Sequence, residues 1–512
     1  MSTARSAVVP TPKGDGATSP DAGAFGGSRA CFEDVVGWLE GTEAGSLSHG
    51  ELEDVLDRRG RELLRRLLQD HLDLRAQREE RVEVIDVDGV THGSVEAGHT
   101  RQLATVFGAV TVERLAYRHR RSTNLHPADA ALNLPDERHS HGLRRAAAIE
   151  STRGSFDDAA EAICRATGVA VGKRQVEELT DRAALDVDEF YAVSAPGAGE
   201  PDDVMVLSAD GKGIVMRPDS LRPATQKAAA ATAPKLESRL SKGEKRNRKR
   251  MAEVGAVCDV TPVPRRAIDV LASNDGHDPP PAPRAKAKWI TASVVEDAAE
   301  VVARVFDEAE RRDPGHRRTW VALVDGNNHQ IDRIQAEAKT RKVSVTIVVD
   351  LIHVIEYLWG AVWCFFTEGD PGAEAWVRDR TMAVLEGNAR DVAAGIRRRA
   401  TTLGLAASKR KKADACATYL TNKAPLLDYP RALAAGWPVA TGVIEGACRH
   451  LVADRMDITG ARWNVHGAEA VLKLRAVRCN QDFDTYWKFH LGKERQRVHE
   501  SRYTDQVIPL AA

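Results

Sequence analysis

The chain has few cysteines and no paired cysteine motif. Seven cysteines, an odd number, are scattered over 512 residues, and no CxxC pair occurs among them. This spacing argues against a disulfide framework and against a zinc ribbon. We therefore expect the protein to work in a reducing compartment, the cytoplasm.

The sequence also lacks an uninterrupted apolar run long enough for a membrane span. Its longest apolar stretch, residues 344–366, contains Asp350, His353 and Glu356, which would be costly in lipid. The stretch instead predicts a buried strand, SVTIVV, that runs into a helix. Residues 1–30 are rich in Gly, Ala, Ser and Pro without the apolar core of a signal sequence, and we expect a disordered tail there and no membrane contact.

Net charge is the third feature that the chain lacks. Its 73 Lys and Arg balance 74 Asp and Glu, for a net charge of −1, so the whole protein exerts no long-range attraction on a polyanion. Affinity for nucleic acid must come from local basic runs. One such run lies in residues 224–252 and ends with Lys245, Arg246, Arg248, Lys249 and Arg250, and a second, RRRATTLGLAASKRKK, spans 397–412. Each run is interpreted as a phosphate-binding segment or as a solvated surface.

Three acidic residues are the most informative feature that is present. Asp210 in VMVLSADGKG and Asp325 in TWVALVDGNN each end a short apolar run and precede a glycine, while Glu445 lies in a predicted helix. Each Asp-Gly pair taken alone is explained by an ordinary turn. A carboxylate at the end of a strand, however, points into open space. Three that converge predict a site for two hard divalent cations, Mg²⁺ or Mn²⁺, in the arrangement used for in-line attack on phosphodiesters.

A second acid and a histidine follow the strand SVTIVV. Asp350 and His353 lie three residues apart at the start of a predicted helix. The pair can share a proton, coordinate a metal or hold a neighbouring ligand in place. The alternative is a capped helix with an incidental histidine.

The segment around Glu445 predicts a helix that begins near Gly442 with Thr441 as its cap. Regular helical spacing puts Arg449 one turn after Glu445, where it would orient the carboxylate, reach a phosphate or form a surface ion pair. The residues themselves leave Asp454 and Asp457 open as alternatives for the third acid.

The N-terminal half contains two recognisable patterns. Residues 51–81 carry an apolar stripe at helical spacing, and residues 82–117 alternate with a period of two, which predicts a small β-rich module with a tight turn near Gly108. Residues 155–184 predict a helix, a Thr-Gly break and a second helix that opens with Lys173, Arg174 and Gln175. This layout is typical of a helix-turn-helix, whose second helix contacts bases in the major groove, and also of helical hairpins that bind no DNA.

Four segments resemble those of Kra-type bacterial insertion-sequence transposases, distant relatives of the Mutator group. They are SADGKGIVMRP, LVDGNNHQ, VVDLIHVIEYLW and TGVIEGACRHLVADRMDITGARW, and the resemblance extends over about residues 80–500. It implies an α/β catalytic core of the ribonuclease-H-like (retroviral integrase-like) type, with α-helical and small β-rich N-terminal modules. It also implies a catalytic triad at Asp210, Asp325 and Glu445, with Asp350 and His353 in support.

The expected domains follow from these patterns. They are a disordered tail (1–30), a helix with a β-rich module (31–142), a helix-turn-helix-like region (143–193), a catalytic domain (204–480) with a basic insertion (224–252) and a helical insertion (370–435), and a C-terminal tail (481–512).

The resemblance implies a DDE transposase that cleaves DNA at the ends of an insertion sequence and joins them to target DNA. Its partners would be double-stranded DNA, as terminal inverted repeats and target, and further copies of the chain in a dimer or larger assembly at the nucleoid. The alternatives are a metal-dependent nuclease of the same fold and a transposon-derived DNA-binding protein without catalysis.

Overall fold

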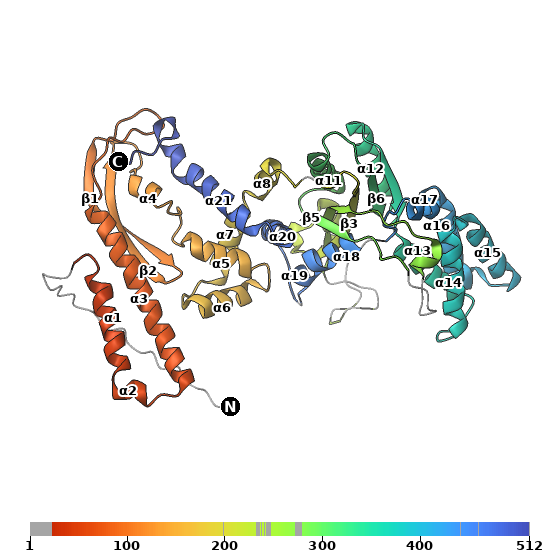
Figure 1. Ribbon diagram of the computed structural model, residues 1–512, viewed down its shortest axis with the longest axis horizontal. Helices are drawn as coiled ribbons and strands as arrows, with labels where there is room; N and C mark the ends of the chain where they lie inside the picture. Colours follow the sequence, from red (N-terminus) through yellow and green to blue (C-terminus); the bar gives the residue numbers. More distant parts are fainter. Residues whose placement is uncertain are drawn as a thin grey trace. The chain divides into compact units, whose positions relative to one another are not determined.

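The computed structural model covers the whole chain and describes residues 23–197, 199–231, 236, 238–239, 241, 247–271, 279–440, 442–458 and 460–510. The chain forms two compact units. Unit 1 is drawn from Met1–Ala146, Ala160–Val171 and Leu491–Ala512, and unit 2 from Ala147–Ala159 and Gly172–His490. Figure 1 shows the elements of both units in chain order.

Unit 1 is built from helices and one β-hairpin. Its elements are α1 (Gly26–Leu39), α2 (Thr42–Gly45), α3 (His49–Gln77), β1 (Ser94–Thr105), β2 (Gly108–Arg118), α4 (Pro127–Ala131) and most of α5 (His141–Glu150). The predicted helix is confirmed as α3, which begins after Ser48, whose backbone N–H donates to Glu51 (2.9 Å). The predicted turn is also confirmed, because β1 and β2 pair from Thr105 and Gly108, and Gly108 has a φ of +124°.

The C-terminal segment belongs to the packed structure. Residues 483–498 form α21 (Phe483–Val498), and the 3₁₀ turns η4 (Glu500–Arg502) and η5 (Thr504–Gln506) follow. Tyr503 is buried and bridges to Asp86, and the His499 ring is 2.8 Å from the Leu134 carbonyl oxygen. The segment expected as a tail therefore contributes a helix and buried side chains to unit 1.

The predicted pair of helices in 155–184 is confirmed. They are α6 (Phe156–Thr167) and α7 (Lys173–Ala183), and the break falls at Gly168, whose φ is +72°. Part of α6 is assigned to each unit, whereas α7 lies in unit 2. A role of these helices in DNA binding stays a prediction.

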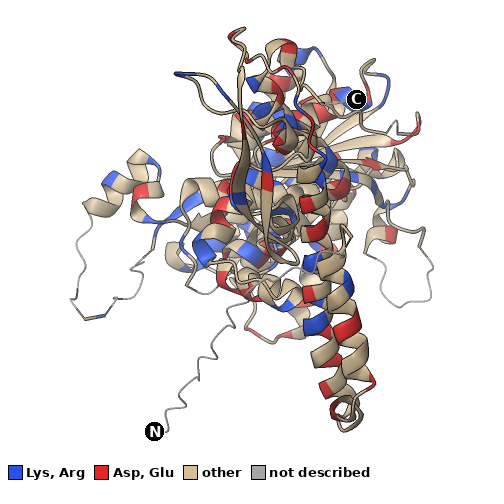
Figure 2. Ribbon diagram, turned by 90° about the vertical axis from the view of Figure 1, so that its left-hand side faces the viewer, with Lys and Arg blue, Asp and Glu red and all other residues tan. Residues whose placement is uncertain are grey.

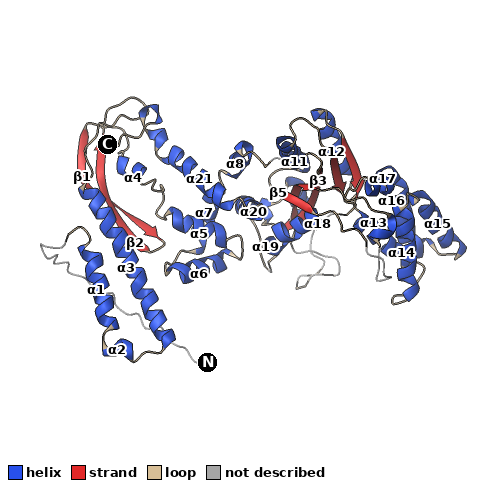
Figure 3. Ribbon diagram, in the orientation of Figure 1, coloured by secondary structure: helices blue, strands red, loops and turns tan. Residues whose placement is uncertain are grey.

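Unit 2 is centred on a five-stranded mixed sheet (Figure 3). Its strands are β3 (Val204–Val215), β4 (Lys249–Val260), β5 (Ala285–Ser293), β6 (Trp320–Val324) and β7 (Val345–Val349), in the order β5-β4-β3-β6-β7. β4 is antiparallel to β3 and β5, whereas β3, β6 and β7 are parallel. The strand SVTIVV is confirmed as β7.

Helices surround this sheet. They are α8 (Val187–Val193), η1 (Pro218–Ser220), α9 (Pro223–Ala230), α10 (Ala267–Val270), α11 (Ala298–Arg312), α12 (Asn328–Arg341), α13 (Leu351–Val362), α14 (Pro371–Leu385), α15 (Ala389–Thr402), α16 (Ala407–Lys423), η2 (Ala424–Leu426), α17 (Tyr429–Ala434), α18 (Gly442–Gly446), the π-helix η3 (Ala447–Ala453), α19 (Asp454–Met456) and α20 (Val465–Cys479). Residues 370–435, expected as a helical insertion, thus contain α14 to α17. Among the described residues no helix combines the length and the apolar content that crossing a bilayer requires.

One face of the sheet is covered by two groups of helices. Val206, Val321 and their neighbours pack with α13 to α17 in one core. Further along the same face, Ile214 and Val254 pack with α18, η3 and α20 in a second core. Because side chains alternate between the faces of a strand, Gly255 points the other way, where an added Cβ would lie 2.5 Å from Val305 of α11. The face that carries Val206 and Ile214 is therefore the one that α18 and Glu445 cover.

One expectation about the strands was wrong. Asp210 was expected at the end of a strand, before a glycine turn, but β3 continues through Asp210 and Gly211 to Val215. Gly211 pairs with Glu253 of β4, and an added Cβ would lie 2.7 Å from Met251. This glycine therefore allows a close cross-strand approach instead of a turn. The strand β5 was not predicted, because its first residues were assigned to a Pro-rich loop.

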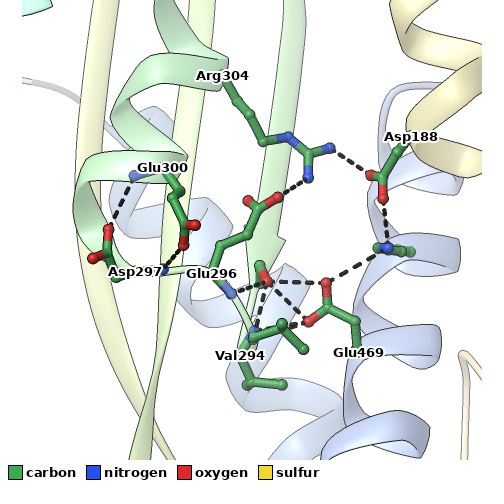
Figure 4. A network of polar contacts seen from close by, with 10 residues as sticks. Asp188, Val294, Glu296, Asp297, Glu300, Arg304 and Glu469 are labelled. Atoms are coloured by element: carbon green, nitrogen blue, oxygen red, sulfur yellow. Dashed lines mark hydrogen bonds and ion pairs between the residues drawn. The ribbon is translucent and has the colours of Figure 1, made fainter.

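A partly buried polar network joins β5 and α11 to α20 (Figure 4). The Glu469 carboxylate accepts hydrogen bonds from Ser293 Oγ (2.9 Å) and from the Val294 backbone N–H (2.9 Å). Arg304 joins Glu296 (3.0 Å) to Asp188 (2.9 Å), which also pairs with Lys473. Each carboxylate in the network has a cationic or hydrogen-bonding partner, so the network offsets the cost of its burial.

Asp181 of α7 gives unit 2 a pH-dependent stability. Burial, and next the neighbouring Glu177 carboxylate, raise the pKa of Asp181 from 3.8 to about 6. The folded chain thus binds a proton that the unfolded chain releases, and the free energy of unfolding falls as the pH rises from about 4 through about 6. We expect Asp181→Asn to stabilise the protein by about 1–2 kcal/mol at pH 8, with the gain vanishing near pH 4.

Chemical denaturation at pH 4, 6 and 8 measures this difference. Glu161→Gln on the exposed side of α6 serves as the matched control, since its partner Arg165 is also exposed. A gain for Asp181→Asn that is equal at all three pH values would contradict the assigned pKa.

Candidate active site

The strand register brings three aspartates to one level of the sheet. Across β3 and β6, Val206 pairs with Val321 and Leu207 with Ala322. Asp210 lies three residues after Leu207, and Asp325 lies three residues after Ala322. Across β6 and β7, Val324 pairs with Val349. The next residues are Asp325 after β6 and Asp350 after β7. Side chains at the same level of neighbouring parallel strands point to the same face. Asp210, Asp325 and Asp350 therefore face the side of the sheet that α18 covers.

Asp210 is held from two sides. Its Oδ1 accepts a hydrogen bond from the Gly211 backbone N–H (2.7 Å), and its Oδ2 accepts one from the Cys448 thiol of η3 (3.3 Å). Burial, and next the charge of Asp210, raise the pKa of the thiol, so Cys448 stays a protonated donor. The carboxyl of Glu253 on β4 also lies near Asp210, and its pKa is raised mainly by burial.

Asp325 begins the loop between β6 and α12. Gly326 has a φ of +88°, which confirms the predicted turn at this Asp-Gly pair. The Asp325 carboxylate accepts a hydrogen bond from the Asn327 backbone N–H (2.7 Å), while the Asp325 backbone carbonyl accepts one from Tyr419 Oη of α16 (3.0 Å). The helical segment 370–435 thus contacts the loop that carries the second acid.

Glu445 lies on α18, which begins at Gly442 as expected and packs on β3 and β4; the expected cap, Thr441, is outside the described residues. The Glu445 side chain is exposed. Burial of part of the carboxyl raises its pKa, and the nearby charges of Asp350, Glu356 and Asp210 add to that rise, against His353, which lowers it. Glu445 is therefore close enough to Asp210 and Asp350 for repulsion between the carboxylates.

The helix that carries Glu445 continues into a π-helix at residues 447–453, where a regular α-helix was expected. The role expected for Arg449 beside Glu445 stays a prediction. Among the described residues no hydrogen bond or ion pair joins the two side chains. Arg449 instead contributes to lowering the pKa of Asp454, whose main partner is His450 (2.8 Å).

Asp350 and His353 hold different partners. Asp350 is buried and caps α13, because its carboxylate accepts a hydrogen bond from the Ile352 backbone N–H (2.7 Å). The His353 ring is 3.2 Å from the Glu356 carboxylate. Both Asp350 and His353 lie near Glu445, whose pKa they shift in opposite directions.

The side chains around this face are oxygen donors. Carboxylate oxygens are the ligands that Mg²⁺ and Mn²⁺ prefer. Within the described part of the chain, however, no group of three or more His, Cys, Asp or Glu side chains is arranged so that it could hold a metal ion.

The candidate DNA-binding residues on α7 are exposed, and each has a partner in unit 2. Lys173 pairs with Asp157 (2.5 Å) and Arg174 with Glu178 (3.0 Å), while the Gln175 side chain accepts a hydrogen bond from the Gly172 N–H (2.9 Å) at the start of the helix. Exposed pairs of this kind are weak, so the two cations remain accessible to phosphate.

The basic segment is only partly described. Lys245 and Arg246 lie outside the described residues. Lys249 and Arg250 open β4, so the end of the expected insertion belongs to the sheet. Arg250 donates to the Val294 carbonyl oxygen (2.6 Å) and Lys249 lies 3.8 Å from Asp457, and Arg248 also has interactions within the protein. Figure 2 shows Lys and Arg interspersed with Asp and Glu along the ribbon.

Sequence reasoning missed several residues of this region. Cys448, Tyr419, Lys423 and Glu253 were not among the predicted site residues. Cys448 reaches Asp210 across 238 positions and Tyr419 reaches Asp325 across 94. No local pattern signals contacts of such length. A comparison with protein-family models finds no match for this chain, and a comparison with curated protein sequences finds none either.

Proposed function

We propose that the protein is a DDE transposase with Asp210, Asp325 and Glu445 as its catalytic acids. The observation that carries this proposal is the shared level of Asp210 and Asp325 on neighbouring parallel strands, on the face where α18 presents Glu445. A mixed sheet with three antiparallel strands in succession and two parallel strands beside them is compatible with the ribonuclease-H-like core that the sequence motifs imply.

The donor type suits Mg²⁺ or Mn²⁺, because these ions prefer carboxylate oxygens and would relieve the repulsion that contributes to the raised pKa of Glu445. The described side chains do not themselves form a cluster of three ligands, so the carboxylates would have to close around the ions on binding. Asp210, Asp325 and Glu445 would hold them. When bound, two divalent ions supply an activated nucleophilic oxygen and a stabilised leaving oxygen. The chain itself fixes the ligands: the Cys448 thiol orients Asp210, and Tyr419 holds the loop of Asp325.

Two reactions would use this site in turn. In the first, water attacks the phosphorus at the end of the element, the P–O3′ bond breaks, and a free 3′ hydroxyl is left. In the second, that hydroxyl attacks a target phosphodiester and displaces the target's own 3′ oxygen, so one phosphodiester forms for each one broken. Asp350 and His353 would support the site, and α7 and the basic segments would hold the DNA. Since two ends must be joined together, we expect a dimer or larger assembly.

A strand-transfer assay tests the proposal. Purified protein, a labelled duplex that carries the end of the element, supercoiled target and Mg²⁺ or Mn²⁺ are incubated beside Asp210→Asn and Asp325→Asn. We expect joined product from the wild type and none from either variant, while duplex binding is unchanged. Cleavage without joining would indicate a nuclease of the same fold. Binding without metal-dependent chemistry would indicate a regulator.

A further inference from the structure

A cavity of about 1010 Å³ opens beside the second acid, between α13, α16 and the loop that follows β6. Its lining comes from Asp325 and the residues that follow it, from one face of α13 that includes His353 and Tyr357, and from α16. Its volume is ample for a nucleotide, since pockets of a few hundred Å³ already hold drug-sized ligands. The cavity takes no part in the reaction steps described above.

Two stacked tyrosines form an aromatic wall of this cavity. The rings of Tyr357 (α13) and Tyr419 (α16) are 3.9 Å apart between centroids and inclined by 15°. Tyr357 is 40% exposed, and within the described residues its ring contacts no aromatic other than Tyr419. One face of the Tyr357 ring is thus available for stacking. Unpaired bases stack on exposed aromatic rings of this kind in proteins that bind single strands.

Cations and amides complete the wall. Lys411 and Lys412 line the cavity and have no ion pair in the described part of the chain. Three acids also line it: Glu356 and Asp414 are paired with His353 and Arg410, and Asp325 is the acid of the candidate active site. Away from Asp325, the unpaired charges on the wall are therefore those of lysines. Asn327, Asn328 and Asn422 add amide groups, which can hydrogen-bond the edges of a base.

The aromatic wall is tied to the acid that it adjoins. Tyr419 Oη donates to the Asp325 carbonyl oxygen (3.0 Å), and the buried Lys423 one turn further along α16 donates to Asn328 Oδ1. A ligand stacked on Tyr357 would therefore lie at a fixed place relative to Asp325.

We propose that this cavity binds an unpaired nucleotide of the DNA strand that enters the active site, with the base stacked on Tyr357 and its phosphate at Lys411 and Lys412. This inference rests on the proposed function for the choice of DNA as the ligand. It can be tested by DNA binding alone, without cleavage or strand transfer.

Fluorescence anisotropy in the presence of EDTA compares a blunt duplex with the same duplex carrying a short single-stranded 3′ tail. We expect the wild type to prefer the tailed duplex. Tyr357→Ala should weaken binding of the tailed duplex about tenfold, with binding of the blunt duplex unchanged within about twofold. Tyr357→Phe should retain the preference, because the stacking face remains.

The cationic part of the cavity is tested separately. The double variant Lys411→Ala/Lys412→Ala should also lose the preference for the tail. Trp363→Ala and Lys409→Ala are the matched controls. Trp363 lies at the end of α13 and Lys409 lies in α16, and both side chains are exposed but do not line the cavity. Circular dichroism and thermal melting establish that each variant is folded.

The result that overturns the inference is equal binding of tailed and blunt duplexes by the wild type, or an equal loss of both in Tyr357→Ala. Competition by free deoxynucleotide at the same concentration as the tailed duplex would overturn it too, because the cavity would then be a mononucleotide site. A protein that prefers the tail through Tyr357 but never joins strands would contradict the transposase and leave this inference standing.

Discussion

Replacing Glu445 by glutamine is expected to reduce both DNA cleavage and strand transfer about 10³-fold. The amide keeps the size of the side chain but removes the charge that α18 presents near Asp210 and Asp350. The fold should be unaffected, because the Glu445 side chain is exposed and makes no hydrogen bond with the described residues. Single-turnover rates with saturating Mg²⁺, together with duplex affinity, separate this loss of chemistry from a loss of binding.

Asp454→Asn and Asp457→Asn are the controls for the third acid, because the sequence left these two positions open. Asp454 is paired with His450 and Asp457 lies near Lys249. We expect both variants to react within about twofold of the wild type. Loss of activity in either one, with Glu445→Gln still active, would move the third acid to that residue.

Gly326→Ala is expected to destabilise the protein by about 2–3 kcal/mol and to reduce activity about 10²-fold. Two causes combine at this position. Its φ of +88° is unfavourable for an L side chain, and an added Cβ would lie 2.6 Å from Tyr419 Oη. The loop that carries Asp325 must then move, since the tyrosine is held by α16. Chemical denaturation and single-turnover cleavage measure the two effects.

Gly395→Ala in α15 is the matched control, because nothing lies within 4 Å of its added Cβ. It should stabilise the protein by about 0.5–1 kcal/mol, as alanine does in a helix. In the double variant Gly326→Ala/Tyr419→Phe the clash with the hydroxyl is gone, so its cost should be smaller than the sum of the two single changes. Strict additivity would show that Tyr419 does not restrain the loop.

Local patterns in the sequence predicted the elements whose signals are local. The apolar run before Asp350 predicted β7 and α13, and the spacing of apolar residues predicted α3, α6 and α7. The Asp325–Gly326 turn was predicted because that glycine is needed for its positive φ. In each case the residues that form the element also carry its signal.

The same reasoning failed where a residue's role is set by its partner. Gly211 follows an aspartate as Gly326 does, so a turn was expected there as well. Instead, Gly211 allows the close approach of Met251 from β4, and β3 continues through it. β5 begins with alternating Ala and Lys and is held as a strand by pairing with β4. The π-helix at residues 447–453 has no periodic signal in the sequence and was not predicted. The shared level of Asp210 and Asp325 depends on the register between β3 and β6, which neither segment contains by itself.

Unit 1 is assembled from both ends of the polypeptide. Asp86 bridges to Tyr503, Asn133 donates to the Leu491 carbonyl oxygen (3.1 Å), and the buried Arg144 pairs with Glu494 (2.5 Å). A ribosome that has released the first 146 residues has therefore not yet supplied the partners that close this unit. Every residue from Gly172 to His490, including all three acids, is synthesised in between. The unit whose translation starts first is thus the last that can be completed, because its full packing requires that residues 172–490 have already been synthesised.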